Sequence, residues 1–72
     1  MTVYILCRQQ SDFPHNDITV VLGAYATKEA AIKGAQKDAR RKTLYSIMEE
    51  SGLISFDCGE HAYDILIEEI QS

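Results

Sequence analysis

Hydrophobic and polar residues alternate along two early stretches of the chain, and such alternation is typical of β-strands. Residues 2–9 (TVYILCRQ) are rich in β-branched and aromatic side chains, with apolar residues on both faces near the middle. Because apolar residues on both faces favour a strand buried on both sides, we predict a central first strand. Residues 18–26 (ITVVLGAYA) follow the same period and predict a second strand. The Pro, Ser, Asp and Asn of residues 10–17 (QSDFPHND) predict a loop between them.

The second strand runs directly into a predicted helix. Thr27 is a suitable N-cap, because its hydroxyl can accept a hydrogen bond from a free amide of the first turn. The helix then begins at Lys28, and its apolar residues form a narrow stripe at helical spacing. This stripe consists of Ala31, Ile32, Ala35 and Ala39.

The C-terminal end of this helix has two interpretations. Residues 37–42 (KDARRK) are polar on almost every side, and the apolar residues that follow point away from the first stripe. One helix over residues 28–51 would be about 36 Å long, whereas a strand of eight residues spans only about 26 Å. We therefore favour a break near Lys42, or a second helix that begins near Thr43 and is closed by Gly52.

The last third of the chain completes the predicted fold. Residues 53–57 (LISFD) are a short strand or an extended connection, and residues 58–61 (CGEH) a turn. Residues 62–70 (AYDILIEEI) fit a strand or one face of a helix, and their isoleucines favour the strand. We predict one α+β domain in β-β-α-β order: an antiparallel sheet of three or four strands with one long or broken helix packed on one face. The other face is either exposed or covered by a second copy, as in a homodimer.

The composition excludes several classes of protein. With 46% hydrophobic and 25% charged residues, the chain has the make-up of an ordinary globular domain. No apolar stretch approaches the roughly 20 residues that span a bilayer, and the N-terminus lacks the basic region of a signal peptide. Two cysteines are too few for a disulfide scaffold, so we expect a cytoplasmic protein that does not cross a membrane.

The net charge of −4 is unevenly distributed along the chain. Six of the seven basic residues lie in the segment 28–42, whereas seven acids and no Lys or Arg occur from Glu49 onward. We expect the acids to contact a basic groove on a protein partner, and the basic residues to offer a second, oppositely charged surface. The candidate acidic contacts are Glu60, Asp64, Glu68 and Glu69, and the candidate basic contacts are Lys37, Arg40 and Arg41. The alternative is a nucleic-acid-binding accessory domain that uses the basic helix 28–42, although such modules are usually basic overall.

The sequence contains no recognisable catalytic motif or cofactor-binding loop. Cys58 and His61 have the two-residue gap of half a zinc site, but the other half would require Cys7 and His15 at a wider spacing. Because isolated cysteines usually behave as small hydrophobes, we favour buried free thiols and keep a metal-stabilised domain as an alternative. A chain of 72 residues also has little room for a substrate pocket. We therefore predict a non-enzymatic protein without a cofactor.

The segment VLGAYATKEAAIKGA (residues 21–35), preceded by VYILCRQ and followed by YDILIEEI, resembles small bacterial and phage proteins of strand–strand–helix–strand order. In these proteins a strand ending in Gly-x-Tyr/Phe-x-Thr leads into a Lys-Glu-Ala helix. Compact, acidic phage proteins of this length resemble inhibitors of host defence, including anti-CRISPR proteins, which mostly occupy a partner's surface. The resemblance implies an inhibitor of a host nucleic-acid-processing or defence complex, and it assigns no individual residues.

Overall fold

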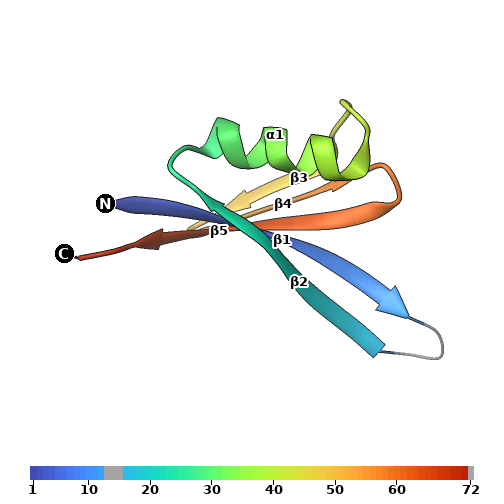
Figure 1. The fold of residues 1–72 in the computed structure, drawn as a ribbon, viewed down its shortest axis with the longest axis horizontal. Helices are drawn as coiled ribbons and strands as arrows, with labels where there is room; N and C mark the ends of the chain where they lie inside the picture. The colour runs from blue at the N-terminus through green and yellow to red at the C-terminus, as the bar shows by residue number, and fades with distance from the viewer. Residues whose placement is uncertain (13–15, 72) are drawn as a thin grey trace.

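The computed structural model describes residues 1–12 and 16–71. Within these residues it contains five strands and one helix: β1 (Thr2–Asp12), β2 (Asn16–Tyr25), α1 (Lys28–Ala39), β3 (Tyr45–Glu50), β4 (Leu53–Cys58) and β5 (His61–Glu69). The strands pair antiparallel in one sheet of order β2-β1-β5-β4-β3. Helix α1 covers one face of this sheet, and no described segment covers the other (Figure 1).

The predicted fold class is wrong in the size of the sheet and the length of the helix. The sheet has five strands instead of three or four, and α1 has 12 residues instead of running to residue 51. No helix in the described part of the chain is long and apolar enough to cross a lipid bilayer. Residues 45–50, assigned above to a long or second helix, form the edge strand β3.

The reason for this correction lies in how α1 ends. Arg40 adopts a left-handed conformation, with φ 57° and ψ 36°, and its N–H caps the carbonyls of the last turn. The N–H of Arg41 donates to the Gln36 carbonyl at 3.1 Å, which closes the helix. The chain then reverses into β3, and Gly52, with φ 81°, closes the tight turn to β4. The helical spacing of the apolar residues in this region is therefore coincidental, and every residue of β3 is exposed.

The predictions for the first half and the last strand are closer to the structure. Thr27 is the N-cap of α1, and its Oγ1 accepts a hydrogen bond from the Ala30 amide at 3.1 Å. Strands β1 and β2 extend into the predicted loop 10–17, of which residues 13–15 lie outside the described chain. Strand β5 confirms the strand interpretation of residues 62–70 to within one residue at each end.

The core lies between α1 and one face of the sheet. Ala31 and Ala35 are fully buried, and their small side chains let the helix axis lie close to the strands. The largest fully buried side chains are Tyr63, Leu6, Ile54, Ile65 and Cys58. Because side chains alternate along a strand, every second residue of β1, β4 and β5 points away from this core.

Candidate interaction surfaces

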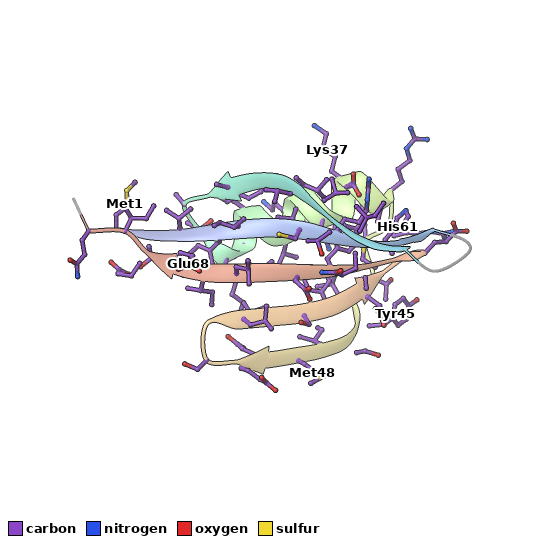
Figure 2. All side chains as sticks on the ribbon, turned by 90° about the horizontal axis from the view of Figure 1, so that it is seen from below. Met1, Lys37, Tyr45, Met48, His61 and Glu68 are labelled. Carbon is purple, nitrogen blue, oxygen red and sulfur yellow. The ribbon has the colours of Figure 1, made fainter. Side chains whose placement is uncertain are left out.

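The side chains that point away from α1 form an uncovered surface, here called the open face (Figure 2). Strand register places Ile5, Leu66 and Leu53 side by side on it, and Val21 and Met48 lie on the outer strands of the next row. The exposed fraction is 66% for Val21, 60% for Met48 and 38% for Leu66. Single exposed apolar residues are normal on a protein surface, but a contiguous group is typical of a contact site.

Carboxylates surround these apolar residues. Where the structure describes side chains, the register places four acids on the open face: Glu50, Asp57, Asp64 and Glu68. Among the described residues, no Lys or Arg side chain lies on this face. Arg8 points toward α1, where it binds Asp38, and the other six basic residues lie on α1 or at positions 40–42. The open face is therefore both apolar and negatively charged.

Asp64 is held by a chain of hydrogen bonds that crosses four strands. Ser55 Oγ donates to Asp64 Oδ1 and Gln9 Nε2 donates to Oδ2, each at 2.8 Å. Thr19 Oγ1 in turn donates to Gln9 Oε1 at 3.1 Å. These donors are neutral, so they fix the position of the half-buried carboxylate without cancelling its charge. Asp64 therefore presents an oriented negative charge at the centre of the open face.

The structure separates the four predicted acidic contacts. Asp64 and Glu68 share the open face. Glu69 lies on the opposite face, where the N-terminal ammonium donates to its Oε1 at 2.8 Å and Thr2 Oγ1 donates to its Oε2 at 2.6 Å. These two hydrogen bonds lower the pKa of the Glu69 carboxyl below its usual range. Glu60 lies in the turn between β4 and β5, beside basic residues of the α1–β3 loop.

Sequence reasoning missed two acids and the apolar part of the open face. Glu50 was not selected, because residues 45–50 were assigned to a helix, and Asp57 was not selected, because residues 53–57 were left as a short strand or an extended connection. Once both β3 and β4 are known to be strands, their register places Glu50 opposite Leu53 and Asp57 opposite Tyr45 on the open face.

The three predicted basic contacts do come together, at the C-terminal end of α1. Lys37 lies in the last helical turn, Arg40 is the C-cap, and Arg41 follows it. They line a shallow hollow of about 360 Å³, here called the basic hollow, together with Lys33, Gln36 and Lys42. Its five cations form no salt bridge with the described residues, whereas Lys28, farther along α1, lies 3.7 Å from Glu49.

A polar cluster between α1 and the sheet positions the helix. Arg8 donates two hydrogen bonds to the Asp38 carboxylate at 2.9 and 3.0 Å, and Tyr63 donates a third at 2.7 Å. Burial acts to raise the pKa of Asp38, but these hydrogen bonds and the Arg8 charge outweigh it, so the pKa lies below its usual range. Burial and the bond to Asp38 raise the pKa of Tyr63. This cluster joins the helix to two strands, and we assign it a structural role.

The candidate zinc ligands are divided between the two faces of the sheet. Cys7 and Cys58 are both buried free thiols, but Cys7 lies on the open-face side and Cys58 on the α1 side. Burial raises the pKa of both thiols, with a further contribution from the negative charge of Asp64 at Cys7. The described residues contain no group of three or more His, Cys, Asp or Glu placed to hold a metal ion, and His15 lies outside them.

No protein-family model, no curated protein and no solved structure matches this chain. Its function is therefore inferred from the surfaces themselves.

Proposed function

We propose that this protein is a non-enzymatic interaction module whose open face binds a basic, partly apolar surface of another protein. The observation that supports this proposal is the combination of contiguous apolar side chains with four carboxylates and no described cation on one uncovered face. Apolar contact supplies affinity, and carboxylates select a partner that carries Lys or Arg. Asp64 is suited to such a contact, because its hydrogen bonds hold it in place before binding.

A second copy of the chain is a less favourable occupant of the open face. Two open faces packed on each other would bring the four carboxylates of each copy together without a Lys or Arg between them. Placing like charges against each other in an interface costs several kcal/mol. Basic side chains of a different protein would instead pair with these carboxylates. Charge complementarity therefore favours a basic protein partner over a homodimer.

The dimensions of the open face suit a complete protein interface. The molecule extends 42 Å along its longest axis, roughly the strand direction, and 20 Å along its shortest, which runs across the sheet (Figures 1 and 2). The rectangle that these extents enclose, roughly 800 Å², is an upper limit to the flat area of the open face, and a standard protein–protein interface buries about 800 Å² on each partner. One partner domain is therefore large enough to cover the face.

The resemblance to phage-encoded inhibitors suggests the kind of partner. Proteins that process nucleic acids carry basic grooves that attract phosphates, and an acidic module seated in such a groove excludes the nucleic acid. We propose a host nucleic-acid-processing or defence complex as the target. We place the protein in the cytoplasm, where a reducing environment keeps thiols such as Cys7 and Cys58 free.

The test compares two sets of surface variants for capture of host proteins, followed by affinity measurement with each purified candidate. Glu50→Lys with Glu68→Lys changes the open face, and Lys37→Glu with Arg40→Glu is the matched control on the basic hollow. We expect the first pair to weaken binding at least about tenfold and the second pair to leave it nearly unchanged. Equal affinity of the open-face variant and the unmodified protein would reject the proposal. If sedimentation shows that the protein is a dimer, and Glu68→Lys changes the dimerisation, the open face binds a second copy of the chain instead.

A further inference from the structure

Two adjoining hollows lie at the C-terminal end of α1, and together they are here called the basic track. The first is the basic hollow described above. The second, of about 260 Å³, is lined by Arg41, Lys42, Thr43, Tyr45, Gly59 and Glu60. Arg41 and Lys42 line both hollows, so the two adjoin at these side chains, between Lys33 on the helix and Tyr45 at the start of β3.

The backbone that carries the central cations is held in place from two sides. Gln36 Nε2 donates to the Lys42 carbonyl at 2.8 Å, and the Gln36 carbonyl accepts from the Arg41 amide at 3.1 Å. The Arg41 carbonyl also accepts from the buried Cys58 thiol at 3.6 Å, which ties this segment to β4. A side chain on Gly59 would press against the Arg41 stem, with Cβ 3.0 Å from Cγ. These contacts present the cations on an ordered backbone, which lowers the entropic cost of binding an anion.

Tyr45 adds an aromatic surface at the far end of the track. Its side chain is 58% exposed and lines the second hollow beside Arg41 and Lys42; Figure 2 shows it toward the same end of the long axis as Lys37 but at the opposite edge of the sheet. Cations beside an exposed aromatic ring are the means by which proteins bind single-stranded nucleic acid, since phosphates meet the cations and a base stacks on the ring. In a duplex the bases are already stacked on one another, so Tyr45 would contribute little.

We infer that the basic track binds single-stranded nucleic acid, with its five cations on successive phosphates and Tyr45 stacked on a base. This goes beyond the proposed function, because it assigns a different ligand to the basic track, which meets the open face at Tyr45, the cross-strand neighbour of Asp57. Two acids limit the affinity: Glu60 lines the second hollow, and Asp57 is the cross-strand neighbour of Tyr45. Because both acids repel phosphates, neutralising either of them must strengthen the binding of single-stranded nucleic acid.

Fluorescence anisotropy with a labelled oligothymidylate of about ten nucleotides tests the inference at low ionic strength. We expect the logarithm of the binding constant to fall with the logarithm of salt concentration, by about 0.7 for each phosphate contact.

Tyr45→Ala should weaken binding at least about fivefold, whereas Tyr45→Phe should retain it. Lys37→Gln with Arg41→Gln should reduce the salt slope by about 1.4. Glu60→Gln should tighten binding.

Two controls decide between this inference and its rivals. A duplex of the same length should bind less tightly than the single strand, and Tyr45→Ala should not affect the duplex. If Tyr45→Ala binds the single strand as the unmodified protein does, or the duplex binds equally well, the inference is wrong. Glu68→Lys on the open face should keep oligonucleotide binding. Loss of protein-partner binding in that variant with retained oligonucleotide binding would show that the two surfaces act separately.

Discussion

The two faces of the sheet share one backbone but use their apolar residues differently. On the α1 side, Leu6, Tyr63 and Ile65 are completely buried beneath the helix. On the open face, Val21 and Leu66 occupy equivalent strand positions but remain exposed, with carboxylates among them. Both faces are apolar enough to be covered, and only one is covered by the described chain. The first face therefore stabilises the fold, whereas the second leaves apolar side chains exposed to solvent.

The largest expected difference in stability is between substitutions of two residues that are adjacent in β5 and point to opposite faces of the sheet. Ile65→Ala should destabilise the protein by about 2–5 kcal/mol, because it leaves a cavity in a closely packed core. Leu66→Ala should cost less than about 1 kcal/mol, because its side chain is already partly in water. Urea denaturation followed by circular dichroism measures both. Equal costs would mean that the open face is already buried in solution.

A smaller change in stability is expected on removing the Tyr63 hydroxyl, which joins the sheet to α1. Tyr63→Phe removes the hydrogen bond to Asp38 and should cost about 1–2 kcal/mol at neutral pH. The folded protein raises the pKa of Tyr63, so this contribution is complete below the unfolded value of about 10 and is lost as pH rises above it. Urea unfolding between neutral and strongly alkaline pH should therefore show a steeper loss of stability for the unmodified protein than for Tyr63→Phe. Parallel profiles would contradict this role.

The smallest effect concerns the two thiols, one on each side of the sheet. Both are buried and have raised pKa values, so we expect slow reaction with an alkylating reagent at pH 8 and rapid reaction in denaturant. Cys7 should react before Cys58, because no helix covers its side of the sheet. Mass spectrometry of partly labelled protein, with each Cys→Ala variant as a control, gives the order. Faster labelling of Cys58 would contradict this order. It would show that α1 separates from the sheet more often than the reagent reaches Cys7 through the open face.

Prediction from the sequence succeeded where neighbouring residues decide the structure. The Thr27 hydroxyl caps the first turn of α1, and this bond involves residues only three positions apart. Prediction failed at residues 45–50, because the signal that ends α1 is the left-handed Arg40, whereas a glycine usually occupies such a position. Without that stop, the helical spacing of Leu44, Ile47 and Met48 favoured the wrong element.

The candidate surfaces were predicted only in part for a related reason. Alternation within β5 suffices to place Asp64 and Glu68 on one face and Glu69 on the other. The pairing of Glu69 with the N-terminal ammonium depends on β1 and β5 being neighbours, and they are separated by most of the chain. The position of Tyr45 beside Arg41 and Lys42 likewise could not be predicted without recognising β3 as a strand.

The amino-acid sequence by itself determined the alternating faces of β1, β2 and β5, the start of α1 and the separation of basic from acidic segments. These features depend on residues a few positions apart, where backbone sterics and capping act. Only the tertiary structure decided which face of the sheet α1 covers and which acids remain together on the other. The reason is physical: the short helix α1 packs on β1, β2, β4 and β5 and leaves β3 exposed, and the strand order then sets which distant side chains become neighbours.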